Sequence, residues 1–131
     1  MYHSIITEID NGIGILTMNR SERHNALDRT LVNEMTTALD EFQADPRVRV
    51  VVLSSTGRSF CAGTDPAWIR ETIHDSPEKN LQDNRSLARL LSTLSGLDKP
   101  TIARVQGDVY AGGIGLVAAC DMAVSVDTAN Y

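Results

Sequence analysis

Short runs of β-branched and apolar residues alternate along this chain with longer segments of helical periodicity, and no other feature of the sequence limits the fold as strongly. The runs predict five strands, at residues 4–10, 13–18, 49–54, 101–105 and 122–126. Helical signals predict four helices, one before the third strand, two before the fourth and one before the fifth. The order β-β-α-β-α-α-β-α-β is typical of an α/β fold.

Capping residues mark where these helices begin. Asp28 is the expected N-cap of a helix with one apolar face, formed by Leu31, Met35, Leu39 and Phe42. Asp65-Pro66 and Ser76-Pro77 each place an N-cap before a proline, which starts two further helices. The fourth helix, of small and apolar residues, covers 112–119.

Two strand features are more specific. Asn11-Gly12 predicts a tight hairpin turn between the first two strands. Val50 to Leu53 is a continuous apolar run, which predicts a strand buried on both faces.

Length and charge exclude several functional classes. A chain of 131 residues predicts a single domain, and its net charge of -5 argues against a general surface for nucleic acid or anionic membrane. No apolar run reaches the length of a membrane span, and the N-terminus lacks the pattern of a secretory signal. Two cysteines in apolar surroundings, Cys61 and Cys120, fit a reducing compartment, so we expect a cytoplasmic protein.

Glycines stand at two expected helix N-termini, in Cys61–Asp65 and in Tyr110–Gly115. The first N–H groups of a helix lack internal acceptors, and glycine permits close approach of another group. Two such ends directed at one point would form an oxyanion hole, which stabilises charge developing on a carbonyl oxygen. Packing and turn geometry alone would also explain glycines at these positions. Neither segment matches a phosphate-binding motif.

These segments resemble the crotonase (enoyl-CoA hydratase/isomerase) superfamily. Asn19–Leu27 is similar to its N-R-P-x-x-x-N-A-L segment, and Ser59–Asp65 to its S-F-C-A-G-A-D loop. The K-P-x-I-A…G…G-G…A-C-D block of the family is matched by Lys99–Ala103, Gly107, Gly112-Gly113 and Ala119–Asp121. Within the superfamily, 103–113 most resembles the methylglutaconyl-CoA hydratases.

The resemblance implies a spiral of ββα repeats, of which residues 1–131 would form the N-terminal part of a single, truncated crotonase-like domain. It also implies hydration of an α,β-unsaturated CoA thioester without any further cofactor, and a trimer or hexamer when the protein is full length. The backbone N–H groups of Thr64 and Gly112 would form the oxyanion hole. Substrate or CoA binding is implied for Arg23, His24, Ala26, Ala62, Gly63, Asp65 and Gly113. No metal is expected, because His3, His24 and His74 lack ligand spacing.

The chain departs from the family pattern at two positions. Thr64 stands where the family has alanine, and Gly115 stands where typical hydratases carry a catalytic glutamate. A second family glutamate would lie beyond Tyr131, so the acid–base chemistry that hydration needs is not provided by these motifs. Two alternatives therefore stay open: a non-catalytic CoA-binding module, and another reaction on the same fold, such as isomerisation, dehalogenation or hydrolysis.

Three further residues have structural interpretations. Asp65 is expected to cap a helix rather than to act as an acid, because Pro66 follows it. Cys61 is expected to be an inert core thiol rather than a nucleophile. Trp68 is expected to be a packing residue or part of a pocket wall.

Overall fold

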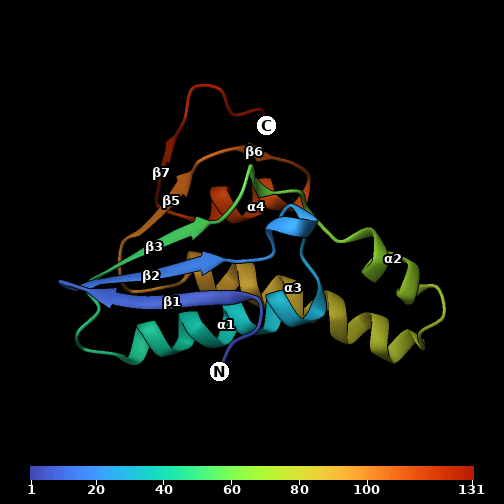
Figure 1. Cartoon of the computed structure of the whole chain (residues 1–131). Helices are drawn as coiled ribbons and strands as arrows, with labels where there is room; N and C mark the ends of the chain where they lie inside the picture. Colours follow the sequence, from blue (N-terminus) through green and yellow to red (C-terminus); the bar gives the residue numbers. More distant parts are fainter.

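The computed structural model describes residues 1–131 and contains a five-stranded sheet in the order β1-β2-β3-β5-β7 (Figure 1). The strands are β1 (Ile5–Asp10), β2 (Ile13–Met18), β3 (Val50–Ser55), β5 (Thr101–Val105) and β7 (Met122–Ser125). β1 pairs antiparallel with β2, and every other neighbouring pair is parallel. The predicted α/β class and all five predicted strands are confirmed.

The predicted hairpin is also confirmed. Asn11 and Gly12 both have positive φ, of 50° and 85°, which is the backbone of a two-residue turn matched to strand twist. This turn pairs Asp10 with Ile13 and fixes the register of β1 on β2.

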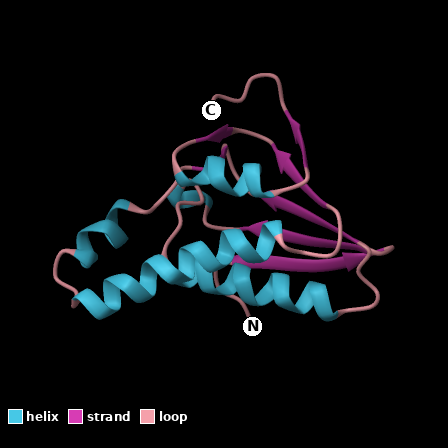
Figure 2. Ribbon diagram, turned by 180° about the vertical axis from the view of Figure 1, so that it is seen from behind, coloured by secondary structure: helices cyan, strands magenta, loops and turns pink.

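Helices cover one face of the sheet. Figure 2 shows α1 (Arg29–Ala44), α3 (Pro77–Ser95) and α4 (Gly112–Ala119) on the same side, while α2 (Pro66–Thr72) extends beyond the edge. The expected caps are present: the side chain of Asp28 accepts from the Leu31 N–H at 2.8 Å, and that of Ser76 accepts from the Lys79 N–H. A cluster of 22 buried apolar residues fills the space between sheet and helices.

Because the helices lie on one face, the prediction for Val50–Leu53 holds only in part. Val51 and Leu53 point to the helices and are fully buried, whereas Val50 and Val52 are half-buried.

All residues of β7, at the sheet edge, are exposed. Asp121 holds this strand to its neighbour, since its carboxylate accepts from the Thr101 N–H and its own N–H donates to the Thr101 hydroxyl.

Three short elements lie where the sequence predicted only loops and a turn. They are η1 (Ser21–Arg23), a single 3₁₀ turn, and two strands, β4 (Ser59–Cys61) and β6 (Asp108–Val109), which form a separate parallel pair. Strands of two and three residues are too short to show an alternating pattern, which is why periodicity missed them.

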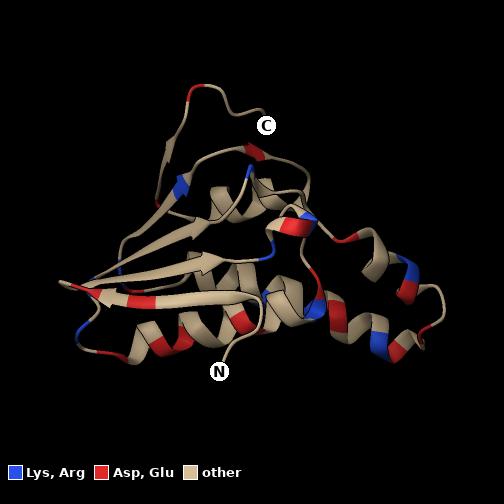
Figure 3. Ribbon diagram, viewed as in Figure 1, with Lys and Arg blue, Asp and Glu red and all other residues tan.

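Figure 3 shows that Lys and Arg residues and Asp and Glu residues are spread over several helices and loops of the ribbon. None of the helices combines the length and the apolar character that crossing a membrane requires.

Candidate active site

The two glycine-bearing segments come together because each follows one strand of the β4–β6 pair. β4 leads into residues 62–65 and then α2, and β6 leads into Tyr110, Ala111 and α4. The strands are parallel, so both segments leave at the same end, and the Tyr110 N–H extends the pairing by donating to the Cys61 carbonyl at 3.0 Å. The short strands missed by sequence periodicity therefore position the site.

Glycine permits the contact between the segments. Gly63 has a φ of +90°, and a β-carbon there would lie 2.9 Å from the Ala111 β-carbon and 3.0 Å from the Tyr110 carbonyl oxygen. A β-carbon on Gly113 would lie 2.7 Å from the Cys61 carbonyl oxygen. Any side chain at either position would push the segments apart.

Several backbone donors at this junction lack an oxygen acceptor. The N–H groups of Thr64, Ala111 and Gly112 have no acceptor within the chain, and that of Gly63 bonds only to the Cys61 thiol. The N–H groups of Ala62, Asp65 and Gly113 all donate to carbonyl groups. Gly112 is exposed and Thr64 half-buried. A β-carbon on Gly112 would lie 3.8 Å from the Thr64 hydroxyl, so the two residues are in contact distance. Free, accessible N–H groups on facing segments can bind an oxygen that carries negative charge.

Ala111 sets the direction of the second donor. Its φ of 49° and ψ of -122° are unusual for a residue with a β-carbon, and this residue directly precedes the Gly112 N–H. Strained backbone of this kind is concentrated at functional sites.

A surface groove of about 390 Å³ passes beside Thr64. Its lining brings together most of the predicted binding residues, namely Arg23, His24, Ala26, Ala62 and Thr64, with Glu22 and Pro66. The Arg23 guanidinium lies 3.1 Å from an Asp65 carboxylate oxygen, and His24 Nδ1 lies 3.1 Å from the Ser59 hydroxyl. Gly63, Asp65 and Gly113 are buried, and substrate contact by all seven predicted binding residues stays a prediction.

Asp65 is the confirmed N-cap of α2, with its carboxylate accepting from the Ala67 N–H at 2.8 Å. Arg20 and Arg23 both donate to it, each at 3.1 Å. Burial alone would raise the pKa of this carboxyl group, but the bonds from Ala67, Arg23 and Arg20 outweigh burial and lower it. Arg20 was not predicted, although its place in the segment 19–27 was a signal that it lies at the site.

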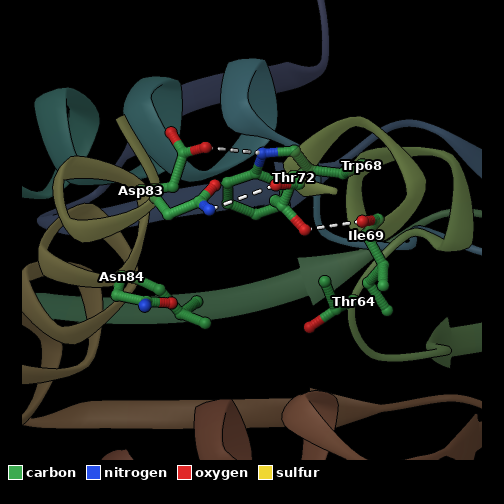
Figure 4. Close-up of a pocket in the computed structure, with 8 residues that line it drawn as sticks. Thr64, Trp68, Ile69, Thr72, Asp83 and Asn84 are labelled. Carbon is green, nitrogen blue, oxygen red and sulfur yellow. Dashed lines mark hydrogen bonds between the residues drawn. The ribbon is translucent and has the colours of Figure 1, made fainter. Parts of the chain in front are cut away.

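A pocket of about 310 Å³ lies on the other side of Thr64, between α2 and α3 (Figure 4). Trp68 forms part of its wall, as the second of the two predictions for this residue proposed. The Trp68 indole N–H donates to Asp83 at 3.2 Å, and Arg29 donates to both Asp83 oxygens at 2.9 and 2.8 Å. The bond from Arg29 lowers the pKa of Asp83 despite burial.

Asp83, Asn80 and Asn84, all on α3, are pocket residues that sequence reasoning missed. A signal existed for Asp83, because it lies one turn before Leu87 and on the same helical face as Leu87, Leu90 and Leu94. A buried carboxylate on an apolar face requires a charged or hydrogen-bonding partner, and the half-buried Arg29 provides one.

Two other predicted features have clear positions. Cys61 is fully buried, and burial raises the pKa of its thiol, so it is an inert core residue. Gly115 lies in α4 beside Leu91, and α4 carries no ionisable side chain.

Comparison with known proteins identifies this architecture. The model of the enoyl-CoA hydratase/isomerase family matches residues 8–131. A Thermus thermophilus protein classed with the enoyl-CoA hydratases is 36% identical over 126 residues, which are 95% of this chain and 50% of that protein. An Arthrobacter 4-chlorobenzoyl coenzyme A dehalogenase is 31% identical, over 98% of this chain and 47% of the dehalogenase.

Solved structures agree with the sequence comparison. The crystal structure of an enoyl-CoA hydratase from Shewanella pealeana superposes with a TM-score of 0.90 at 34% identity, covering 94% of this chain and 46% of that one. The chain spans about half the length of the curated relatives it matches.

Proposed function

The chain belongs to the enoyl-CoA hydratase/isomerase family, and from that premise we propose that it binds an acyl-CoA thioester with the carbonyl oxygen between the N–H groups of Thr64 and Gly112. The observation that supports this proposal most directly is that these two N–H groups have no acceptor within the chain and belong to residues that lie near each other, one exposed and one half-buried, where the two segments meet. A thioester oxygen that becomes enolate-like gains more from such donors than the ground-state carbonyl does.

The position of Thr64 between the groove and the pocket suggests how the CoA and acyl portions of a bound thioester are arranged. Thr64 lines both the groove that contains Arg23 and His24 and the pocket between α2 and α3. We infer that the CoA portion follows the groove, where Arg23 and His24 are near its phosphates, and that the acyl group enters the pocket.

Hydration is the reaction we favour. Water would add its oxygen to the β-carbon of the enoyl group while the π electrons move toward the thioester carbonyl. The water would release one proton as its oxygen bonds to the β-carbon, and the enolate oxygen would accept hydrogen bonds from the N–H groups of Thr64 and Gly112. The α-carbon would then take a proton, so that OH and H are added across the double bond. One such donor is typically worth about 2.7–4 kcal/mol of barrier lowering.

A second candidate is binding without turnover, or a different reaction on the bound thioester. Within residues 1–131, the one carboxylate that lines the acyl pocket is Asp83, and Arg29 and Trp68 already bind it. Gly115 supplies no acid or base. The family resemblance extends to a dehalogenase, so the same segments are compatible with more than one chemistry.

Calorimetric titration with CoA and crotonyl-CoA tests the proposal, followed by an assay for loss of the enoyl absorbance. Saturable binding in which the thioester binds more tightly than free CoA is the expected result. Turnover would establish hydration, and binding without turnover would favour the second candidate. Absence of binding to both compounds would refute the proposed function.

Two associated expectations are proposals as well. Activity should need no cofactor besides the CoA thioester, which dialysis against a chelator would test. The trimer or hexamer that the family resemblance implies is checked by light scattering of the whole protein.

A further inference from the structure

We propose that the pocket between α2 and α3 selects a neutral acyl group whose end can donate a hydrogen bond, and that it discriminates against an acyl group ending in a carboxylate. This inference rests on the proposed function, because it takes this pocket as the acyl site.

Uncommitted polar atoms line the pocket. Figure 4 shows the Thr64 hydroxyl and the Asn84 carboxamide facing each other across it, and neither side chain is bonded to another residue drawn there. Asn80 donates from Nδ2 to the Thr72 carbonyl at 3.1 Å, which leaves its Oδ1 buried without a donor. That oxygen is enclosed by protein, so a ligand would instead reach the Thr64 hydroxyl and the Asn84 carboxamide, each of which can accept from an N–H or O–H.

The charged groups of the pocket oppose an anion. Asp83 is the only ionisable residue among the eight that line it. The nearest guanidinium, that of Arg29, is held by Asp83 at 2.8 Å and also lies 3.7 Å from Asp75 and 3.9 Å from Glu71. A carboxylate in this pocket could accept from Thr64 or Asn84, but it would find no free cation, would face Asp83, and could not donate to the oxygens of these two side chains.

The pocket lining disfavours methylglutaconyl-CoA, the substrate class that the resemblance of residues 103–113 suggests. Methylglutaconyl-CoA carries a terminal carboxylate. A carboxamide or a hydroxyl group meets both requirements, since each can donate to an acceptor and neither carries charge.

Three CoA thioesters of equal heavy-atom shape test the inference by calorimetry. Succinamoyl-CoA ends in a carboxamide, succinyl-CoA in a carboxylate and 4-methylpentanoyl-CoA in an isopropyl group. We expect succinamoyl-CoA to bind about tenfold more tightly than succinyl-CoA, and several-fold more tightly than 4-methylpentanoyl-CoA. Equal affinities, or tightest binding of succinyl-CoA or of 4-methylpentanoyl-CoA, would overturn the inference.

Binding of free CoA distinguishes failure of the proposed selectivity from failure of the proposed function. Binding of CoA and all three thioesters without the expected order overturns only the selectivity. Failure of CoA and every thioester to bind overturns the proposed function and the inference with it.

Asn84→Leu provides a test at one residue. It should reduce the preference for succinamoyl-CoA over 4-methylpentanoyl-CoA by about threefold or more. Because the readout is a ratio within one protein, a partly unfolded sample does not alter it. The same exchange at Asn33, an exposed residue of α1, should leave the ratio unchanged. An unaltered ratio in Asn84→Leu would contradict the role of this side chain.

Discussion

Gly63 and Ala111 approach so closely that a β-carbon on Gly63 would lie 2.9 Å from the Ala111 β-carbon. The same added atom would lie 3.2 Å from the Gly112 nitrogen. This single contact therefore sets the separation of the two segments that carry the free Thr64 and Gly112 donors.

Gly63→Ala should lower stability and weaken thioester binding together. The new β-carbon meets Ala111, and the φ of +90° is strained for alanine. We expect a loss of about 1–3 kcal/mol in the free energy of unfolding, measured with urea.

Gly115→Ala is the matched control for this substitution. Its β-carbon would make only ordinary contacts with Leu91, at 3.7 and 3.8 Å, and alanine favours a helix interior. Stability should rise by about 0.5–1 kcal/mol. If both alanine variants were equally stable, close packing at Gly63 would not be what holds the segments together.

Asn25→Ala should be strongly destabilising although the side chain carries no charge. Asn25 is fully buried, accepts from the Arg20 N–H at 2.8 Å, and donates to the carbonyls of Thr56 and Ser59. Alanine leaves the Arg20 N–H and the Thr56 carbonyl without a partner, while the Ser59 carbonyl still accepts from Gln106, and the φ of residue 25 would have to remain near 54°. A loss of roughly 2–4 kcal/mol is expected from chemical denaturation.

Asn33→Ala serves as the comparison for Asn25→Ala, because Asn33 is exposed on α1. It should change stability by less than about 0.7 kcal/mol, in the stabilising direction set by helix propensity. Similar losses in the two variants would show that the Asn25 network contributes little.

Acid should weaken the attachment of α3 to α1. The bond from Arg29 lowers the pKa of Asp83 below its ordinary value of 3.8. A depressed carboxyl pKa contributes stability that is complete above the unfolded-state pKa and is lost as pH falls through the folded-state pKa. The stability difference between the protein and Asp83→Asn should therefore be constant near neutral pH and shrink below about pH 4.

Denaturant titrations of both proteins at several pH values measure that difference directly. Groups other than Asp83 titrate in both proteins and cancel in the comparison. A difference that stayed constant down to about pH 2 would contradict the ionised Asp83–Arg29 pair.

Sequence patterns predicted the sheet and helices because those elements are long enough to repeat a period. The predicted strand at 49–54 and the cap at Asp65 depend on local chemistry, and both are present with a shift of at most one residue. The β4–β6 pair could not be predicted in this way. Its five residues are too few to show a period, and its two strands are far apart in the chain. Motif resemblance, rather than periodicity, predicted that the segments around Thr64 and Gly112 share a site.

The polar side of the pocket between α2 and α3 could not be predicted from spacing alone. Asn80 and Asn84 lie two turns before Leu87 and Leu91, so they extend the apolar face of α3 with side chains that are usually solvated. They line a pocket only because α2 packs across α3, where Asn80 donates to the Thr72 carbonyl. Such tertiary contacts are decided by the whole fold and leave no local signal.

Gly112→Pro should selectively impair thioester binding, because proline removes the free N–H of this residue. Gly112 is the first residue of α4, where proline is compatible with a helix, and no hydrogen bond of the fold is lost. Proline also disfavours the φ of 49° and ψ of -122° of Ala111, so Gly112→Pro should be less stable than Gly112→Ala. Gly112→Ala keeps the N–H, and its β-carbon would come no closer than 3.7 Å to any neighbour.

The measured quantity is the affinity for crotonyl-CoA divided by that for free CoA. We expect this ratio to be about tenfold lower in Gly112→Pro than in Gly112→Ala, and any hydration rate to differ by roughly 10²–10³. Circular dichroism melts of both variants establish that each is folded. Equal ratios in two folded variants would show that the Gly112 N–H does not bind the thioester oxygen.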